Sequence, residues 1–283
     1  FRLRDKLGFD PKLYPYIYLD VYELHNSVCE ILDPICRLED LSRMRFKYNR
    51  KIVNSITIVG EYKDKFYDPK YDGARLIRDY VFICFLMGND FIPRLPCLKI
   101  HNGSLNDIIV LYKLISWKLG NFLINQDLTV NRTFLYHLLG SISSLENNFM
   151  LDISEKRYKD INYFKNRLRG KSKYEQEVLK FDYIENQYKD TIVGGTIDWR
   201  KRYYDYHIGL KYHNHKEFQR KLRPMCQSYI EGMNWVLQYY IGWHNNWSWH
   251  YPYDTAPTAL DLFESLSNIN LNFEFVDDLP VEP

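Results

Sequence analysis

The residues with the clearest chemical potential are Gly88, Asn89 and Asp90, which directly follow an apolar segment. Glycine lets the backbone turn sharply, and a buried element before it would fix the direction of the Asp90 carboxylate. Hard divalent cations such as Mg²⁺ prefer oxygen ligands of this kind, usually several carboxylates with water and substrate phosphate. A lone Gly-Asn-Asp is a weak motif, and an aspartate that only caps the following turn is the simpler interpretation of so short a pattern.

A second candidate is the aromatic segment over residues 247–253, which contains Trp247 and Trp249 and follows Trp243. Flat side chains on an irregular, proline-stiffened segment can stack on unpaired bases without reading their sequence. Most Trp and Tyr side chains instead fill a core or an interface. The pattern leaves both interpretations open.

Two basic runs are candidates for contact with a nucleic-acid backbone. In the second run, tyrosines are interleaved and the Trp-rich segment follows, so Arg200, Lys201 and Arg202 are the preferred backbone candidates. Charged runs are more often solvated faces, and this applies above all to the first run. The first comprises Lys156, Arg157, Lys159, Lys165, Arg167, Arg169, Lys171 and Lys173, and the second Arg200, Lys201, Arg202, Lys211, Lys216, Arg220, Lys221 and Arg223.

Hydrophobic periodicity predicts the elements that position these residues. A strand is expected over residues 16–21, and a surface loop with some strand over residues 45–72. The apolar run 76–87 indicates a helix buried on all sides, with a strand as the alternative. Further helices are expected over residues 22–31, 105–117, 133–145, 155–190 with a break at Gly170, 227–240 and 259–265, and a hinge or turn at Gly194-Gly195.

Composition limits the class of protein. Of the 283 residues, 46% are hydrophobic and 17% aromatic, which indicates a large buried core, and a net charge of +2 gives no whole-molecule attraction to nucleic acid. The five cysteines form no CxxC pair, so we expect reduced thiols in an intracellular protein, with the cytoplasm favoured over the nucleus. Neither a signal peptide nor an apolar stretch of membrane-spanning length is evident. The GxSxG motif of serine hydrolases, the HExxH motif of zinc proteases, the P-loop and the dinucleotide-binding fingerprint are also lacking.

Four segments, in order and at matching spacing, resemble motifs of the Xrn family of 5′→3′ exoribonucleases. Residues 78–98 resemble the helix followed by the family's GNDF-P-LP block, and residues 119–123 the glycine-containing segment after it. Residues 229–240 are similar to the Y-EG-WVL-YY helix. Residues 247–257, with Asp261, match the W-W-YPY-AP-D segment. The resemblance spans nearly the whole chain.

The resemblance implies a fold and a chemistry. Family members degrade single-stranded RNA with a 5′-monophosphate, using Mg²⁺ (or Mn²⁺) held by a cluster of carboxylates, and Asp90 takes the place of one ligand. Gly88 and Asn89 would support it, and Trp247 or Trp249 would stack on the terminal base. The implied fold is α/β turning mainly α-helical, with few strands near the amino terminus and a large helical lobe that completes a PIN/flap-nuclease-like core.

The implied division places the carboxy-terminal part of the α/β nuclease core in residues 1–110 and a helical Xrn-type domain in residues 111–283. The family's amino-terminal half, which carries the other carboxylates and the 5′-phosphate pocket, has no counterpart here. We therefore expect a piece of a longer protein that is inactive alone and whose main partners are that missing half and RNA, without a membrane. Three family positions differ, at Arg94, His207 and the segment 250–255.

Two other functions stay open at this point. One is a non-catalytic RNA-binding or scaffold module that keeps the helical half of the fold. The other is a structure-specific DNA nuclease of the flap-endonuclease kind, which also places Gly-x-Asp after a hydrophobic helix. The Trp-rich segment argues against the latter.

Overall fold

The computed structural model describes residues 20–32, 72–181, 191–242, 246–271 and 273, and these residues are mainly helical. Their α-helices run, in order, as α2 (Val21–Leu32), α5 (Gly73–Phe85), α6 (Ser104–Leu119), α7 (Arg132–Leu168), α8 (Lys173–Phe181), α9 (Trp199–Ile208), α10 (His215–Ile241) and α11 (Ala259–Ser265). Two short 3₁₀ helices complete the described elements: η2 (Ile100–Asn102) lies shortly before α6, and η4 (Leu266–Asn268) directly follows α11. The predicted mainly helical architecture is confirmed.

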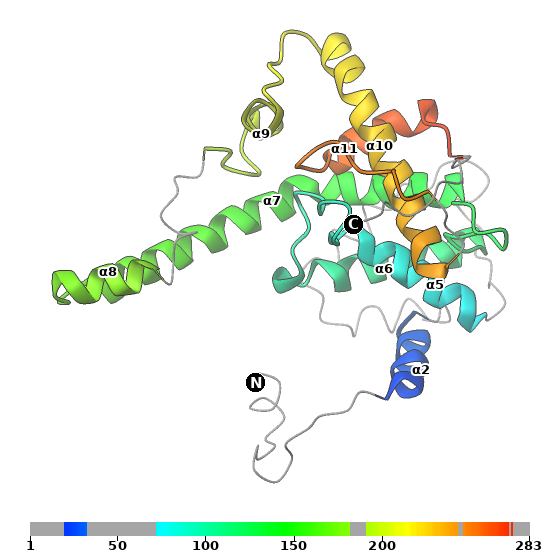
Figure 1. Cartoon of the computed structure of the whole chain (residues 1–283), viewed down its shortest axis with the longest axis horizontal. Helices are drawn as coiled ribbons and strands as arrows, with labels where there is room; N and C mark the ends of the chain where they lie inside the picture. The colour runs from blue at the N-terminus through cyan, green and yellow to red at the C-terminus, as the bar shows by residue number, and fades with distance from the viewer. Residues whose placement is uncertain (1–19, 33–71, 182–190, 243–245, 272, 274–283) are drawn as a thin grey trace.

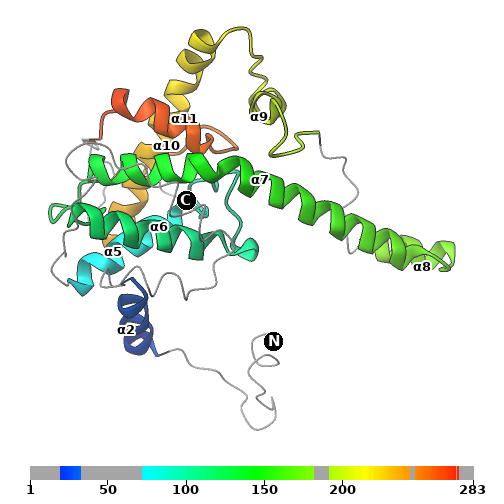
Figure 2. The same ribbon diagram turned by 180° about the vertical axis from the view of Figure 1, so that it is seen from behind.

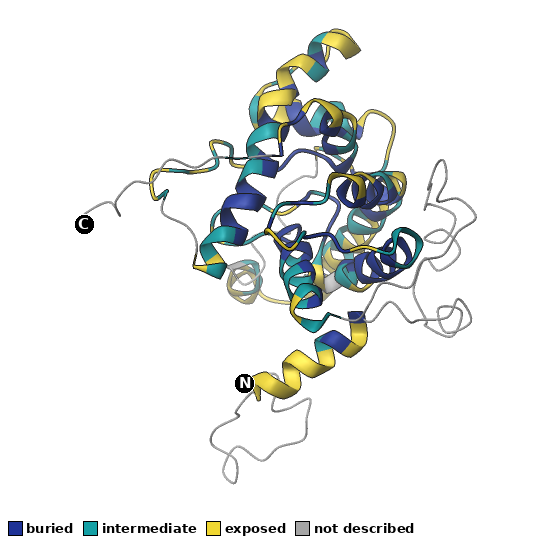
Figure 3. Ribbon diagram, turned by 90° about the vertical axis from the view of Figure 1, so that its right-hand side faces the viewer, coloured by how far each residue is buried: buried dark blue, intermediate teal, exposed yellow. Residues whose placement is uncertain are grey.

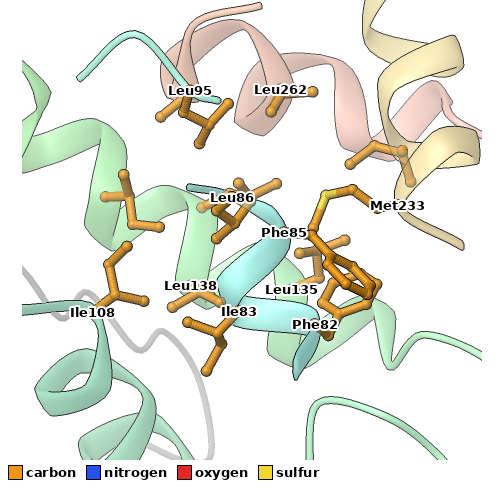
Figure 4. Packing of buried hydrophobic residues seen from close by; sticks show 14 of the residues in the cluster. Phe82, Ile83, Phe85, Leu86, Leu95, Ile108, Leu135, Leu138, Met233 and Leu262 are labelled. Atoms are coloured by element: carbon orange, nitrogen blue, oxygen red, sulfur yellow. The ribbon is translucent and has the colours of Figure 1, made fainter. Parts of the chain in front are cut away.

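Helix α5 lies at the centre of the core, as its apolar residues on all sides predict. Its residues Phe82, Ile83 and Phe85 are buried, and so is Leu86 at its carboxyl end. Figure 4 shows these side chains surrounded by residues of four other helices, among them Ile108 of α6, Leu135 and Leu138 of α7, Met233 of α10 and Leu262 of α11. The strand alternative for this segment is excluded.

A buried carboxylate ties α5 to its neighbours. Asp79 is fully buried and accepts hydrogen bonds from the Tyr112 hydroxyl (2.7 Å) and from the backbone N–H groups of Leu123 (2.7 Å) and Ile124 (2.8 Å). Burial raises the pKa of Asp79 to about 6, and these hydrogen bonds, which favour the ionised form, counteract only part of the rise. The orientation of α5 is therefore fixed by polar as well as apolar contacts.

Helix α7 joins two segments that the sequence predicts as separate helices. Nearly all of its buried residues lie before residue 151, and Phe164 is the single buried one beyond it. The remainder projects from the body and carries α8 at its tip (Figures 1 and 2). The change from an apolar to a solvated pattern therefore marks the edge of the body and not the end of the helix.

The strand predictions fall largely outside the described residues. Residues 16–19 and 45–71 are not described, and Val21, the last residue of the first predicted strand, begins α2. Within the described part, β-pairing is limited to one antiparallel bridge between Ile124 and Val130. Figure 3 shows α2 exposed over most of its length and buried only at its carboxyl end, where Cys29 and Leu32 lie.

The predictions for α2 and α6 agree with the structure to within two residues, and α11 begins and ends where periodicity places it. The helix predicted from residue 227 starts earlier, at His215, because the first turns of α10 are charged and carry few apolar residues. Gly195 has a positive φ of 78°, as a turn at Gly194-Gly195 requires. The predicted domain boundary at residue 110 lies inside α6, whose residues pack in the shared core. No helix among the described residues combines the length and apolarity needed to cross a membrane.

Candidate functional site

The Asp90 carboxylate lies at the tip of a turn that directly follows α5. Gly88 has φ +86°, and a Cβ at this position would lie 2.8 Å from the backbone nitrogen of Arg94, so a side chain there is excluded. The Asn89 side-chain oxygen accepts hydrogen bonds from the N–H groups of Phe91 (2.9 Å) and Ile92 (3.0 Å). Gly88 and Asn89 thus build the turn, and their support of a metal-binding Asp90 stays a prediction.

Asp90 takes no part in building that turn. Its side chain is exposed and makes no hydrogen bond or ion pair with any described residue. The simpler interpretation of the sequence, an aspartate that caps the next turn, therefore does not hold, because Asn89 makes the capping hydrogen bonds. A rigid turn holds a carboxylate that the fold itself does not use.

The residue after Asp90 connects this turn to the aromatic segment. The ring of Phe91 lies edge-on to Trp235 (5.0 Å between centroids) and to Tyr239 (4.9 Å), both on α10. Trp249 stacks on Trp235 at 5.1 Å, and the edge of Trp247 meets Tyr239 at 6.1 Å. The turn that carries Asp90 and the Trp-rich segment therefore pack against the same two residues of α10.

The two tryptophans of the Trp-rich segment differ in exposure. Trp249 is half-buried, and its ring fits so closely against α10 that a Cβ at Gly232 would lie 2.7 Å from it. Trp247 is 41% exposed. Stacking on a base requires an accessible ring face, so Trp247 is the better candidate for that role and Trp249 supports the surface beneath it.

Helix α10 also packs directly against the turn that carries Asp90. The same Cβ at Gly232 would lie 2.8 Å from the side chain of Ile92, and the Tyr229 hydroxyl donates to the carbonyl of Pro93 at 3.0 Å. A small residue at position 232 is therefore needed for α10, the turn and Trp249 to meet. Gly232 lies in a segment that resembles a family motif, but its sequence context predicts no function for it.

Two of the three candidates for backbone binding are engaged in ion pairs. Arg200 forms a two-point hydrogen bond with the buried carboxylate of Asp261. The Lys201 ammonium pairs with Asp198 at 2.8 Å and lies 4.2 Å from the centre of the Tyr212 ring. Arg200 in particular acts as part of the core, although its proposed role in RNA binding is not tested by these contacts.

The third candidate, Arg202, holds together the loop before α9. Its guanidinium donates to the carbonyls of Ile192 (2.9 Å) and Ile197 (2.8 Å) and to the Thr196 hydroxyl (2.7 Å). These contacts use three of the five N–H donors of the guanidinium and fix its orientation toward the loop. RNA binding by this residue therefore stays a prediction that its contacts do not favour.

Two further carboxylates, Asp261 of α11 and Glu146 of α7, are buried. Asp261 is fully buried and accepts from the Tyr204 hydroxyl (2.7 Å) and the Gln219 amide (3.2 Å) in addition to Arg200. Glu146 accepts from the N–H groups at the start of α11, at Ala259 (2.8 Å) and Leu260 (3.2 Å). Burial raises the pKa of Glu146 to about 7 despite these hydrogen bonds. Glu146 has no sequence signal, because its partners lie more than a hundred positions away.

The described residues contain no group of three or more His, Cys, Asp or Glu side chains arranged to hold a metal ion. Asp90 suits Mg²⁺ as one oxygen ligand, because it is exposed, anionic and unpartnered. One carboxylate does not make a stable magnesium site, so the other ligands would have to come from outside the described residues. The four described cysteines are free thiols and offer no alternative metal centre.

Comparison with known proteins shows relatives of one kind. The 5′-3′ exoribonuclease 2 of Gallus gallus is 26% identical over 266 residues, which cover 72% of this chain and 27% of that protein. The 5′-3′ exoribonuclease 1 of Homo sapiens is 26% identical over 242 residues, covering 72% of this chain and 14% of that protein. The counterpart 5′-3′ exoribonuclease 2 of Schizosaccharomyces pombe is 37% identical over 90 residues, 32% of this chain and 9% of that protein.

The chain thus spans roughly a quarter or less of these relatives' length. The sequence model of the Xrn1 helical domain family matches it in two overlapping segments, residues 70–179 and 152–283. These segments include the Asp90 turn, helix α10 and the Trp-rich segment. The chain therefore belongs to the Xrn1 helical domain family.

Proposed function

We propose that this chain is the part of a 5′→3′ exoribonuclease that supplies one metal-binding carboxylate and the aromatic surface beside it. The observation that supports this is the contact of Phe91, next to Asp90, with Trp235 and Tyr239. An acidic tip and a stacking surface held on one rigid support are what removal of a terminal nucleotide requires. The relatives named above are exoribonucleases, which favours the same reaction for the parent of this chain.

In the proposed enzyme Asp90 is one ligand of Mg²⁺ or Mn²⁺, and residues outside this chain provide the rest. The ion would supply Lewis-acid stabilisation of the phosphodiester during its hydrolysis. The contribution of this chain is to fix the direction of one carboxylate through Gly88 and Asn89. We further propose that the helical lobe completes a PIN/flap-nuclease-like core and that the parent works inside the cell.

The proposed substrate is single-stranded RNA with a 5′-monophosphate. Trp247 presents the more exposed ring and would stack on a base, while Trp249 and Trp235 stack beneath the surface. Stacking on a flat ring suits any base, so the enzyme would act with little regard to sequence. The family's amino-terminal half would provide recognition of the 5′-phosphate.

A second function is favoured by one observation. Asp90 is a single exposed carboxylate, and no cluster of metal-binding residues surrounds it within the described part of the chain. A parent that lacks the other carboxylates would keep the aromatic surface and bind RNA without cleaving it. The two functions make opposite predictions for the activity of the longer protein.

The test is digestion of 5′-monophosphorylated RNA by the longer parent protein in the presence of Mg²⁺. We expect Asp90→Asn to lower the rate by about 10³-fold or more, because removal of a charged metal ligand costs several kcal/mol of transition-state stabilisation. The matched control is Asp205→Asn, which changes an exposed aspartate of α9. This control should retain the parental rate.

Each outcome decides between the two functions. An active parent that loses its activity only in Asp90→Asn supports the nuclease function. A parent that binds RNA but never cleaves it supports the binding module. An active parent that tolerates Asp90→Asn would overturn the role assigned to Asp90.

A further inference from the structure

Three cations on the first half of α10 form a stripe that the fold does not use. Lys216, Arg220 and Arg223 are spaced i, i+4 and i+7, which places them on one face of the helix. All three are exposed, and none makes a hydrogen bond or ion pair with any described residue. Lys221, on a different face of the same helix, differs from them because it pairs with Glu217 at 2.9 Å.

This arrangement is unfavourable for the isolated helix. Like charges at i, i+4 destabilise a helix, and Lys216 also lies in the first turn, where the helix dipole disfavours a cation. Glu217 attracts Arg220 electrostatically without forming an ion pair with it, and no hydrogen bond or ion pair with a described residue offsets the remaining cost. An external anion would remove both costs at once.

The carboxylates closest to the stripe do not supply that anion. Glu217 is engaged by Lys221, and Glu264 on α11 is engaged by the Gln219 amide and by Arg200 at 3.6 Å. Two nearby cations, Arg200 and Arg202, bind groups within the protein: Arg200 binds the Asp261 carboxylate, and Arg202 binds the Ile192 carbonyl. The stripe is therefore available to a partner, as is the exposed Lys211 of the same basic run.

Helix α10 connects the stripe to the Asp90 site. The helix runs without interruption from His215 to Ile241, although Pro224 lies within it (Figure 1). At about 1.5 Å of rise per residue, Arg223 lies about 14 Å along the axis from Gly232 and Lys216 about 24 Å. The stripe is thus a few nucleotides away from the turn that Gly232 contacts.

We infer that Lys216, Arg220 and Arg223 bind consecutive phosphates of a single RNA strand, several nucleotides from the one at Asp90. Cations about 5–6 Å apart along a helix can each meet one phosphate of an extended strand. This assignment rests on the proposed function for the position of the strand, but binding can be tested without cleavage. The basic track predicted from sequence is retained, with different residues from Arg200, Lys201 and Arg202.

The experiment measures binding of a 20-nucleotide oligouridylate to the longer parent carrying Asp90→Asn, so that the RNA stays intact. The triple variant Lys216→Gln, Arg220→Gln and Arg223→Gln is compared with a triple variant of paired lysines, Lys171→Gln, Lys180→Gln and Lys221→Gln. Both variants remove the same charge, and the three control lysines have acidic partners in the structure. Fluorescence anisotropy over a range of salt concentrations gives the affinity and its salt dependence.

We expect the stripe variant to bind about 10-fold to 100-fold more weakly at low salt, with a slope of log affinity against log salt reduced by about 2. The control variant should differ little from the parent. Equal losses in both variants would overturn the assignment, because they would indicate attraction to net charge alone. Unchanged RNA affinity together with lost binding of a polyglutamate peptide would overturn it in favour of an acidic protein partner.

A length-dependent readout separates this inference from the proposed nuclease function. With Asp90 intact, the stripe variant should degrade a trinucleotide at the parental rate but a 20-nucleotide RNA with a raised KM. Loss of activity on both lengths would contradict binding at a distance. A parent inactive on both would refute the nuclease function while leaving the anisotropy result valid.

Discussion

Asp90 and Asp261 are aspartates of two family motifs with opposite surroundings. Asp90 is exposed on a turn that Asn89 builds, and it has no partner among the described residues. Asp261 is fully buried, and Arg200, Tyr204 and Gln219 all donate to its carboxylate. One carboxylate is exposed and makes no hydrogen bond or ion pair with a described residue, and the other is fully engaged by buried partners.

This difference identifies Asp261 as a structural acid and leaves Asp90 as the acid for which we propose a function. Burying a carboxylate costs free energy that must be offset by hydrogen bonds and an ion pair, and such a set of partners surrounds Asp261. An acid that is positioned by its neighbours but bonded to none of them has no structural reason to be an acid. The same distinction separates Arg200 from Lys216, Arg220 and Arg223.

The largest expected effect is on stability and concerns Asp261→Asn. Removing this charge leaves the Arg200 guanidinium, whose side chain is 21% exposed, with only the longer ion pair to Glu264 at 3.6 Å among the described residues. We expect a loss of about 3–5 kcal/mol in the free energy of unfolding, as for other broken buried pairs. Urea unfolding of this chain measures it, with Asp90→Asn as the control, which should change the value by less than about 0.5 kcal/mol. Equal losses of stability in the two variants would contradict the distinction between a structural Asp261 and an Asp90 that the fold does not need.

The next largest expected effect is a dependence of the free energy of unfolding on pH, caused by the buried Glu146. Burial raises the pKa of its folded form from 4.5 to about 7. Between these values the unfolded chain releases the proton while the folded chain keeps it, so stability falls as pH rises through this window. The contribution is about 3 kcal/mol, present in full below pH 4.5 and lost above pH 7.

Glu146→Gln removes this titration and tests its sign. We expect the free energy of unfolding of the original protein, relative to Glu146→Gln, to decrease steadily between pH 4.5 and pH 7. Asp79 contributes in the same direction in both proteins, because its folded pKa is also raised, to about 6. A gap between the two proteins that is independent of pH would show that Glu146 is ionised in the folded state throughout.

The sequence predicts most helices because their signals are local. Apolar residues on all sides of residues 76–87 place α5 in the core, and Thr258 before residues 259–265 provides the N-cap of α11. The continuous α7 is missed because the prediction follows hydrophobicity, which drops where the helix leaves the body. The chain itself carries no glycine or proline between residues 141 and 169 that would end the helix.

The site is predicted only in parts, because its assembly depends on distant contacts. Asp90 and the tryptophans are recognisable as motifs, but their meeting through Phe91 and α10 is a property of tertiary packing. The pairing of Arg200 with Asp261 joins positions 61 residues apart, which no local pattern reveals. The sequence therefore locates the second basic run, and the structure shows which of its cations have no partner among the described residues.

The smallest expected effect is the most specific to the site and comes from Gly232→Ala. The added methyl group would lie 2.7 Å from the Trp249 ring and 2.8 Å from Ile92, so the turn or the ring must move. We expect a loss of about 1–3 kcal/mol in stability. The near-ultraviolet circular dichroism of the stacked tryptophans should also change.

The control for that variant is Gly140→Ala, whose methyl group would meet the Phe263 ring at 2.8 Å between α7 and α11. Both variants overpack a helix contact, so their stability losses should be similar. Only Gly232→Ala should lower the activity of the longer parent, because only its contact includes the turn that holds Asp90. Similar activity in both variants would mean that Asp90 does not depend on α10 for its position. The rigid support that distinguishes Asp90 from an ordinary surface acid would then lose its functional meaning.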